Sequence, residues 1–459
     1  MKTNHLDKYK NVFFIGIGGI SMSGLAEVLN QDGKQVSGSD QNTSPITKRL
    51  ETLGIRVFEG HHADHITNDY DLIVYTAAIK EDNCEFMKAK SLGSVMMDRA
   101  TLLGHIMSGY SMSVGVAGTH GKTTTTSMLS HIMLEGDLDP TISVGGILKG
   151  INGNFKVGKS DYFITEACEY TNSYHKFFPM INIILNIEED HMDFFKDIHE
   201  IRESFTKYMG NTSSQGLLIV NDSIEDIDEL TKGLKCHVCS VGKNIDSTYS
   251  YTNETFDQQG LGSFDLLHHG SFLTRIHLNV TGYHNIENAL ASIAAGLFMN
   301  IDITTIQKGI LAFGGADRRF EYKGSVNGVT IIDDYAHHPT EILKTLEATS
   351  KIEHNELWVV FQPHTYTRTK AFFDDFVQAL KGIDHLVITD IYAAREKDPG
   401  DIHSKMLVEI LGKLGTDIVY IDDFEEIKEH LLKNFLPKDM LITMGAGNVN
   451  LIGDMLLSK

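Results

Sequence analysis

Short apolar runs alternate with amphipathic stretches along most of the chain. In the first block, to about residue 107, the runs VFFIGIG, QVSGSD and DLIVYTAAI are separated by helical segments such as LAEVLNQDG. Strands that alternate with helices are typical of a parallel sheet with helices on both faces. We therefore predict an α/β domain over residues 1–107.

A second block, residues 108–316, opens with the apolar strand MSVGVAG at 112–118 and continues through DYFITEACE and INIILNIEEDH. Residues 216–242 have the pattern of a strand, a helix and a strand. Residues 244–280 are more polar, rich in Gly, Ser and Thr, and without a helical period, so we expect a small antiparallel region there. A helix is predicted at 284–299.

The third block, residues 317–459, repeats the parallel pattern with the strands GVTIIDDY, LWVVFQPH, HLVITDIY, DIVYIDD and DMLITMGAG. Pro339 stands where a helix would make its first turn. In open parallel sheets, ligands bind outside the carboxyl ends of the strands. Polar residues and glycines end these strands, which predicts a site there: Asp333, Asp334, Gln362, His364, Asp390, Gly445 and Gly447.

Length and charge narrow the class of protein. A chain of 459 residues exceeds one ordinary core, and a formal net charge of -21 argues against nucleic-acid binding. The polar N-terminus lacks a signal-peptide core, and no apolar run approaches the length of a membrane span, so a cytoplasmic protein is expected. Four cysteines do not make a disulfide framework. We interpret Cys236 and Cys239 as strand residues rather than as half of a zinc site.

The glycine-rich stretch FFIGIGGISMSG at 13–24 is the first candidate for phosphate binding. A strand that turns tightly into a helix lets backbone N–H groups hold a phosphate. Gly16 and Gly18 fit the pattern G-x-G-x-x-G of dinucleotide sites, Gly19 adds flexibility, and Ser21 takes the place of the third glycine. Asp40 stands where an acidic residue would hold a ribose. From these residues alone, the predicted ligand is either a dinucleotide or another nucleoside diphosphate.

The stretch VAGTHGKTTTTSML at 116–129 is the strongest local signal and predicts a nucleotide triphosphate site. The loop is a shortened variant of the usual phosphate-loop pattern, because Val116 stands at the first glycine position. Its glycines would let the backbone curl around an anion, its lysine would supply a cation, and the following helix would add its positive end. The predicted ATP-binding residues of the loop are Gly118, Thr119, His120, Gly121, Lys122, Thr123 and Thr124.

Magnesium prefers oxygen ligands and keeps several waters, so one or two protein groups suffice. The hydroxyl of Thr123 is one candidate. Glu166 and the EEDHMD loop with His191 end two further strands of the same block, which would place them beside the phosphates. Acidic loops are also common as solvated surface. We favour the metal role and predict Mg²⁺ ligands at Thr123, Glu166 and His191.

At this point the chain resembles a known family. The segments GTHGKTTTT, EACEY, NIEEDHMD, GYHNIENALASI, DRRFE, DDYAHHPTEI, FQPHTYTRT and GAGNVN occur in order over nearly the whole chain and resemble the Mur ligases. FIGIGGISMSGLA and DDYAHHPTE are more similar to the members that add L-alanine than to those that add D-glutamate or a diamino acid.

The resemblance implies three domains: a Rossmann-like domain for a UDP-sugar, a central P-loop ATPase and a Rossmann-like domain for the amino acid. It implies that L-alanine is joined to the lactyl carboxylate of UDP-N-acetylmuramate through an acyl phosphate, with release of ADP and phosphate, in peptidoglycan synthesis. ATP and Mg²⁺ are the expected cofactors, with two ions and Mn²⁺ as a substitute. We expect a monomer or homodimer without nucleic-acid or membrane partners.

The resemblance also implies roles for single residues. Asn285 and Asn288 would contact the adenine, although Asn at a helix start also caps helices. Arg319 would reach the ATP phosphates, with a structural salt bridge as the alternative, and Asp334 the ribose. Tyr335, His337 and Arg368 would line the amino-acid site, and Lys122, His191, His337 and Arg368 would be catalytic. The glycine-rich stretch with Ser21 and Asp40 would then hold the UDP-sugar rather than NAD.

One position departs from the family pattern. The family commonly has arginine after the histidine of QPH, whereas this chain has Thr365. Threonine cannot make a forked contact to a carboxylate, so more of the anion contact would fall to Arg368. The nearest alternative function is a recycling ligase that joins a whole tripeptide to the same UDP-sugar. An NAD-dependent oxidoreductase and a non-enzymatic ATP-binding regulator are more distant alternatives.

Overall fold

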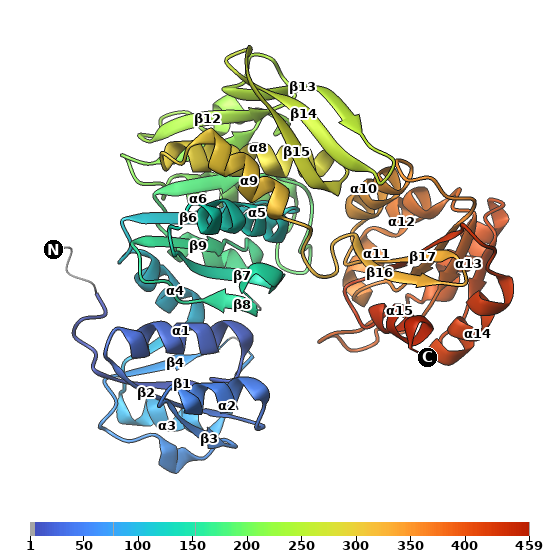
Figure 1. The fold of residues 1–459 in the computed structure, drawn as a ribbon. Helices are drawn as coiled ribbons and strands as arrows, with labels where there is room; N and C mark the ends of the chain where they lie inside the picture. The colour runs from blue at the N-terminus through green and yellow to red at the C-terminus, as the bar shows by residue number, and fades with distance from the viewer. Residues whose placement is uncertain (1–4, 77, 152, 459) are drawn as a thin grey trace. The chain divides into compact units, whose positions relative to one another are not determined.

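The computed structural model describes residues 5–76, 78–151 and 153–458, so residues 1–4 of the polar N-terminus lie outside the described residues. By its internal contacts the chain divides into two compact units. The first contains Met1–Ile187, Arg202–Ser240 and Ala291–Gly309, and the second contains Glu188–Ile201, Val241–Leu290 and Ile310–Lys459. Figure 1 shows three α/β regions in chain order, from blue to red. The predicted three-part α/β fold with mainly parallel sheets is confirmed.

The first sheet is entirely parallel, with the strand order β3-β2-β1-β4-β5. Its strands are β1 (Asn11–Ile15), β2 (Gln35–Asp40), β3 (Arg56–Glu59), β4 (Leu72–Tyr75) and β5 (Met96–Asp98). Helices α1 (Ile20–Gln31), α2 (Pro45–Thr52), α3 (Cys84–Leu92) and α4 (Arg99–Met107) connect them, with a 3-10 turn at Ala63–His65. Ser44, Asn83 and Asp98 cap α2, α3 and α4 through their side-chain oxygens.

The second sheet begins in the first unit with the order β12-β11-β10-β6-β9-β7-β8. Its strands are β6 (Met112–Ala117), β7 (Thr141–Leu148), β8 (Gly153–Lys156), β9 (Tyr162–Glu166), β10 (Ile181–Ile184), β11 (Leu217–Asn221) and β12 (His237–Gly242). The pairs formed by β6, β9, β10 and β11 are parallel, and β7 with β8 is antiparallel. The helices are α5 (Lys122–Glu135), α6 (Ile198–Met209) and α7 (Ile227–Leu230), and 3-10 turns occur at Lys149–Ile151 and Tyr170–Lys176.

The antiparallel region predicted for residues 244–280 is present in the second unit. It consists of β13 (Tyr249–Phe256), β14 (Leu261–His268) and β15 (Ser271–Thr281). Helix α8 (Tyr283–Phe298), predicted at 284–299, and helix α9 (Ile303–Ala312) follow. Cys239 is buried within β12 and Cys236 directly precedes that strand, and neither of the two forms a disulfide bond. The prediction that both are strand residues is therefore confirmed for Cys239 and wrong for Cys236.

The third sheet has the order β16-β17-β21-β18-β19-β20, and all its pairs are parallel except β16 with β17. Its strands are β16 (Glu321–Val326), β17 (Val329–Asp334), β18 (Leu357–Phe361), β19 (His385–Ile388), β20 (Ile418–Tyr420) and β21 (Met440–Met444). Its helices are α10 (Pro339–Thr349), α11 (Tyr366–Ala371), α12 (Phe373–Leu380), α13 (Ser404–Lys413), α14 (Phe424–Asn434) and α15 (Asn450–Leu457). Pro339 starts α10, as predicted.

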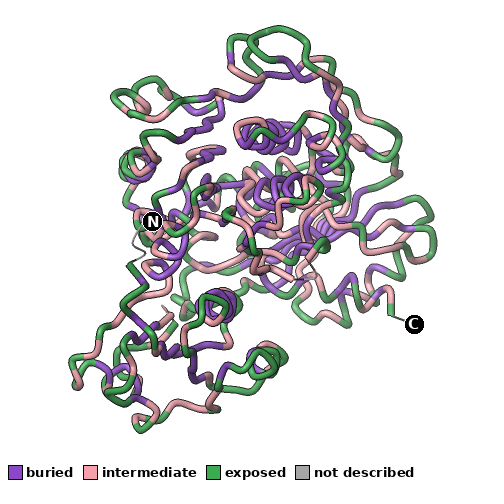
Figure 2. The backbone as a smooth tube through the Cα atoms, turned by 60° about the vertical axis from the view of Figure 1, so that its left-hand side comes forward, coloured by how far each residue is buried: buried purple, intermediate pink, exposed green. Residues whose placement is uncertain are grey.

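Buried backbone follows the central strands and the helices packed on them, whereas the connecting loops are exposed (Figure 2). Strands β10, β11, β18 and β21 are buried at every position, as expected for strands covered on both faces. Among the described residues, no helix combines the length and the apolar character needed to cross a membrane.

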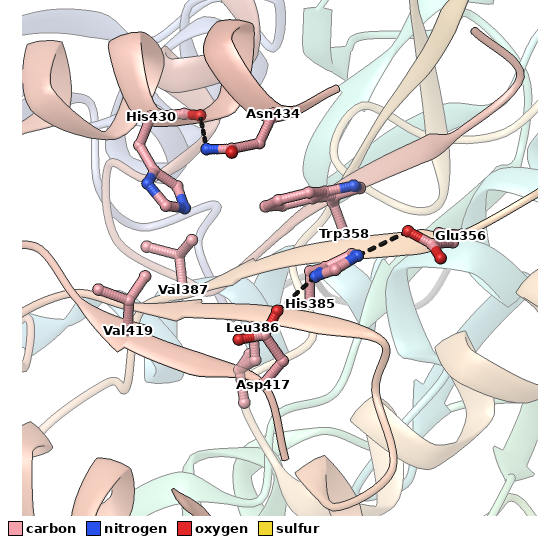
Figure 3. Close-up of a pocket in the computed structure, with 9 residues that line it drawn as sticks. All are labelled: Glu356, Trp358, His385, Leu386, Val387, Asp417, Val419, His430 and Asn434. Carbon is pink, nitrogen blue, oxygen red and sulfur yellow. Dashed lines mark hydrogen bonds and ion pairs between the residues drawn. The ribbon is translucent and has the colours of Figure 1, made fainter. Parts of the chain in front are cut away.

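At the amino-terminal ends of its strands, the third sheet carries a cluster around the chain's single tryptophan (Figure 3). The predicted polar site lies at the other, carboxyl ends. The ring of His385 stacks on Trp358 with centroids 4.0 Å apart. Its Nε2 lies 2.7 Å from Glu356 Oε2 and its Nδ1 lies 2.6 Å from Asp417 Oδ2. His430 of α14 meets the indole edge-on across a cavity of about 370 Å³. The imidazole therefore bridges the residues that precede β18 and β20.

We expect His385 to make the second unit more stable at acidic pH. Burial alone would lower the pKa of His385, but the hydrogen bonds to Glu356 and Asp417 outweigh it and raise the pKa. This contribution is present in full below the unfolded pKa, about 6.5, and is lost as the pH rises through the higher folded pKa. Because both carboxylates are largely exposed, we expect about 1 kcal/mol or less.

The check is urea unfolding of the wild type and the His385→Gln variant between pH 5 and pH 9. The stability difference should shrink as the pH rises. Fluorescence of the single tryptophan should increase over the same range, because a protonated imidazole quenches an indole stacked on it. A stability difference that does not change with pH would contradict the assignment.

Candidate active site

The loop between β6 and α5 has the backbone of an anion cradle. Gly118 and Gly121 have φ values of 144° and 85°, in the region that side chains disfavour. A Cβ at position 118 would lie 2.9 Å from the Leu185 side chain. Asn186 holds the loop from the end of β10, because its Oδ1 accepts from His120 N at 2.7 Å and its Nδ2 donates to His120 O at 3.1 Å. The loop is thus shaped before any ligand binds.

Lys122 begins α5 and is directed into this loop. Its Nζ donates to the carbonyls of Gly118 and Thr119 and forms an ion pair with Glu169 at 3.0 Å. Burial would lower the pKa of Lys122, but Glu169 outweighs it and holds the pKa above its ordinary value, so the amine is charged. Glu169 is 3% exposed, which makes this a nearly buried ion pair. The arrangement places a fixed positive charge where phosphate is predicted.

Two of the three predicted metal ligands lie against the same two residues of β7. Glu166 Oε1 accepts from Gly145 N at 2.5 Å, and a Cβ at Gly146 would lie 3.1 Å from Thr123 Cγ2. Register pairs Glu166 with Val116, just before the phosphate loop. A hydroxyl and a carboxylate at this position are hard oxygen donors of the kind that Mg²⁺ takes. His191, the third predicted ligand, belongs to the second unit.

The first glycine-rich loop is closed by the aspartate predicted to hold a ribose. Asp40 Oδ2 accepts from Gly18 N at 2.8 Å, and a Cβ at Gly18 would lie 2.9 Å from that oxygen. Gly16 has a φ of 83°, Gly19 is the N-terminal cap of α1, and Ser21 Oγ accepts from Arg99 at 3.1 Å. The structure brings these five predicted residues together at the carboxyl end of β1.

The predicted amino-acid site is a chain of aromatic and cationic contacts in the second unit. The Tyr335 and His337 rings are 5.4 Å apart, as are those of His337 and His364. Nη1 of Arg368 lies 3.2 Å from His364 Nδ1. Burial, with His337 and Arg368 nearby, lowers the pKa of His364 to about 4, so this imidazole is neutral at neutral pH. The three predicted residues are brought together, and His364 joins them.

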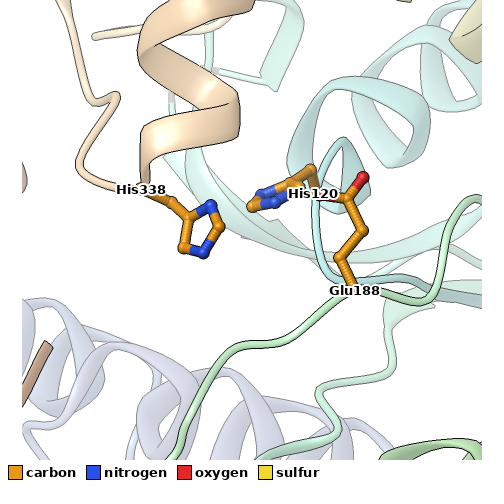
Figure 4. A group of neighbouring side chains, drawn as sticks. All are labelled: His120, Glu188 and His338. Atoms are coloured by element: carbon orange, nitrogen blue, oxygen red, sulfur yellow. The ribbon is translucent and has the colours of Figure 1, made fainter. Parts of the chain in front are cut away.

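Arg368 also has an acidic partner in the loop that carries His191. Its Nη2 donates to Asp190 Oδ1 at 2.6 Å, and both side chains are 10% exposed. Burial would raise the pKa of Asp190, but Arg368 and His191 hold it far below its ordinary value. His191 itself has a φ of 53°, which is uncommon for a residue with a side chain. Figure 4 shows Glu188 of this loop, His338 at the start of α10 and His120 of the phosphate loop.

The two predicted adenine contacts are engaged within the start of α8. Asn285 Nδ2 donates to Thr281 O at 2.7 Å, and Asn288 Nδ2 donates to Asn285 Oδ1 at 3.1 Å. Both side chains are buried. Neither of these two bonds is an N-terminal cap, because in a cap a side-chain oxygen accepts from a backbone N–H. Both the capping alternative and the adenine contact therefore stay predictions.

The adjacent arginines of the DRRFE segment differ in their contacts. Arg318 donates from Nε to Asp333 Oδ2 at 3.1 Å, and from Nη1 and Nη2 to the carbonyls of Gly447 and Gly445. Arg319 has a weaker ion pair, 3.7 Å from Glu341, whereas both guanidinium groups lie over the Tyr335 ring. Arg319 is therefore the one with capacity for a ligand.

Asp334, the predicted ribose contact, lies at the end of β17. It accepts from Phe320 N and Ala336 N at 2.8 Å and 2.7 Å. Burial raises the pKa of Asp334 to about 6 in spite of the nearby Arg319. The two carboxylate oxygens of Asp334 thus bind the backbone N–H groups directly after Arg319 and Tyr335. The ribose contact of Asp334 stays a prediction.

Sequence reasoning did not single out the charged partners Glu169 and Asp190, nor Glu341, which lies 3.1 Å from His337. Glu169 and Asp190 stand in the motifs EACEY and EEDHMD. EACEY contains two carboxylates and EEDHMD contains four, so only the folded chain distinguishes the one that pairs with the lysine or the arginine.

The fold and the loops define a class: a three-part α/β protein with a phosphate loop in its central part. Three models of a single protein family match successive parts of the chain. Residues 11–111 match the Mur ligase family catalytic domain, 116–296 the Mur ligase middle domain, and 318–447 the Mur ligase glutamate ligase domain. The chain belongs to the Mur ligase family.

Individual proteins are similar over the full length. The UDP-N-acetylmuramate--L-alanine ligase of Agathobacter rectalis is 53% identical over 451 residues, which cover 98% of each chain. The crystal structure of the UDP-N-acetylmuramate-alanine ligase of Thermotoga maritima has a TM-score of 0.78 at 27% identity, covering 97% of this chain and 98% of that one. A murein peptide ligase from Psychrobacter arcticus has a TM-score of 0.66 at 24% identity and 98% coverage of both, which shows the shared fold.

Proposed function

We propose that this protein is an ATP-dependent ligase that joins L-alanine to the lactyl carboxylate of UDP-N-acetylmuramate, giving UDP-N-acetylmuramoyl-L-alanine, ADP and phosphate. The observation that carries the proposal is the full-length similarity to the alanine ligase of Agathobacter rectalis. The product is a precursor of peptidoglycan, and the nucleotide substrates place the reaction in the cytoplasm. A tripeptide in place of alanine is the alternative acceptor that the test below must include.

The glycine-rich loop of the first sheet is proposed to hold the UDP-sugar. Backbone N–H groups at the start of a helix attract a diphosphate, and the fixed loop at Gly16–Gly19 offers them beside Asp40. The phosphate loop after β6 is proposed to hold ATP in the same manner, with Lys122 as the added cation. Two separate nucleotide loops in one chain suit a reaction that uses a nucleotide-linked sugar together with ATP.

The hydroxyl of Thr123 and the carboxylate of Glu166 are proposed to bind Mg²⁺, since both side chains lie against Gly145–Gly146 beside the phosphate loop. His191 is proposed as a ligand of a second ion. When bound, such an ion neutralises phosphate charge. Lys122 is proposed to have the same task, because its charge offsets that of ATP as a second anion, the substrate carboxylate, approaches it. Arg319 keeps its predicted role as an ATP contact.

The first chemical step forms a bond between a carboxylate oxygen of the lactyl group and the γ-phosphorus, and the bond to the β–γ bridging oxygen breaks to release ADP. The resulting acyl phosphate is then attacked at its carbonyl carbon by the amine of alanine. An amide forms, and phosphate leaves with the electron pair of the broken C–O bond. The amine must arrive without its extra proton and in line with the carbonyl.

His337 is proposed to accept the proton that the amine must lose. Its Nδ1 lies 2.9 Å from the Tyr335 carbonyl oxygen, which can only accept, so Nδ1 is the donor in the neutral ring. The lone pair is then on Nε2, which is free to act as a base. Arg368 is proposed to bind the carboxylate of alanine, with neutral His364 beside it.

The test is release of ADP by the purified protein with ATP, Mg²⁺ and UDP-N-acetylmuramate, measured with no acceptor and with each amino acid. Release is expected with L-alanine or a close analogue only, and mass spectrometry should find the alanyl product. The tripeptide L-Ala-γ-D-Glu-meso-diaminopimelate serves as the competing acceptor. Turnover with the tripeptide and none with alanine would replace the proposal by the recycling reaction.

A further inference from the structure

Asp190 holds the guanidinium of Arg368 and the backbone of His191 with one oxygen. Its Oδ1 accepts from Arg368 Nη2 at 2.6 Å and from His191 N at 2.7 Å. The distance between Asp190 Oδ2 and His191 Nε2 is 3.9 Å. The bond to His191 N therefore supports a backbone that has a φ of 53° and costs energy to maintain.

The guanidinium depends on this contact for its position. Arg368 Nε is buried and has no hydrogen-bond partner among the described residues, so it does not anchor the group. Nη1 reaches His364 Nδ1 at 3.2 Å, a longer and weaker contact than that to Asp190. Asp190 makes a single-oxygen contact rather than a fork, which leaves the guanidinium free to turn if the aspartate is removed.

We propose that Asp190 is a positioning residue that holds Arg368 where the carboxylate of the amino acid binds and holds the backbone of His191 in the same contact. The inference rests on the proposed function. A buried ion pair alone is weak evidence for stability, since apolar replacements of such pairs are often neutral or stabilising. The shared oxygen instead couples two residues that are both predicted to serve the reaction.

The decisive variant is Asp190→Asn, which preserves size and removes the charge. We expect the KM for L-alanine to rise about tenfold or more, because the arginine loses its fixed orientation, a change equivalent to about 1.4 kcal/mol. The KM values for ATP and UDP-N-acetylmuramate should change less than about threefold. Glu203→Gln, which neutralises an exposed glutamate of α6 outside the loop, is the matched control and should leave all three values unchanged.

Two further variants distinguish positioning from folding. Asp190→Glu keeps the charge on a longer side chain, so it should fold and raise the KM for alanine less than the asparagine does. The charge-reversed pair Asp190→Arg with Arg368→Asp should regain much of the melting temperature but not the low KM for alanine. A lower melting temperature of Asp190→Asn with an unchanged KM for alanine would overturn the proposal and leave a structural ion pair.

The proposed function and the positioning role fail in different ways. If the wild type releases no ADP with alanine, the function is wrong whatever the variants do. If the wild type uses alanine and Asp190→Asn behaves as the Glu203→Gln control does, the function stands and the positioning role is wrong.

Discussion

Replacing Lys122 with methionine is expected to reduce the rate of ADP release by about 10²–10³-fold or more, the usual loss when one charged contact to a transferring phosphoryl group is removed. Lys122 is directed into the phosphate loop and is charged, and methionine keeps most of its volume. The measurement is ADP release with saturating ATP, UDP-N-acetylmuramate and L-alanine. A rate within tenfold of the wild type would exclude Lys122 from phosphate binding.

The same substitution also removes the Lys122 ammonium that pairs with the buried Glu169, so unfolding must be separated from lost catalysis. An uncompensated buried charge costs about 3–5 kcal/mol. Adding Glu169→Gln to Lys122→Met removes that charge. The double variant should therefore recover most of the melting temperature while its turnover stays low, which attributes the lost rate to the missing cation.

The second large effect is expected for Arg318→Ala, with a loss of about 3–5 kcal/mol in the free energy of unfolding. Asp333 is 1% exposed and loses its ion-pair partner, and the carbonyls of Gly445 and Gly447 lose the donors that Arg318 supplies. Thr443 Oγ1 still donates to Asp333 Oδ1 at 2.6 Å, but one hydrogen bond does not neutralise a carboxylate. Urea unfolding of the full chain, followed by tryptophan fluorescence of Trp358, measures the loss.

The adjacent Arg319 is the matched control for this prediction. Its ion pair with Glu341 is long and about a third of its side chain is exposed, so Arg319→Ala should cost less than about 1 kcal/mol. The proposed function further expects a raised KM for ATP in this variant. If Arg318→Ala and Arg319→Ala lower the free energy of unfolding equally, the assignment of Arg318 as the structural one of the two arginines is contradicted.

Most strands were predictable because burial on both faces leaves a continuous apolar run in the sequence. The strands that were not predicted lack such a run. β3 has no fully buried position and β5 has three residues, all half-buried. β7 contains Gly145 and Gly146, which interrupt the pattern, and β16 is an edge strand with no buried position. Short, half-exposed strands leave little hydrophobic signal to recognise.

The candidate site was predictable where backbone geometry requires a particular residue. Gly118 and Gly121 have φ values that select glycine, so the motif is visible in the sequence. The choice of ionic partner is a different problem. Arg318 and Arg319 are adjacent and chemically identical, and only their directions in the fold give one to Asp333 and leave the other near Glu341. Roles assigned to single residues by motif accordingly stay predictions until they are measured.

The glycine loop after β6 has a consequence for inhibitors and resistance. A compound whose anionic group binds the main-chain amides of that loop contacts N–H groups that every amino acid except proline possesses, so among single codon changes only one to proline can delete such a donor. Any other codon change could block the loop only by altering or adding a side chain, and at Gly118 that side chain would meet Leu185 at 2.9 Å with the backbone at a φ of 144°. Such a mutant would damage its own loop before it excluded the drug.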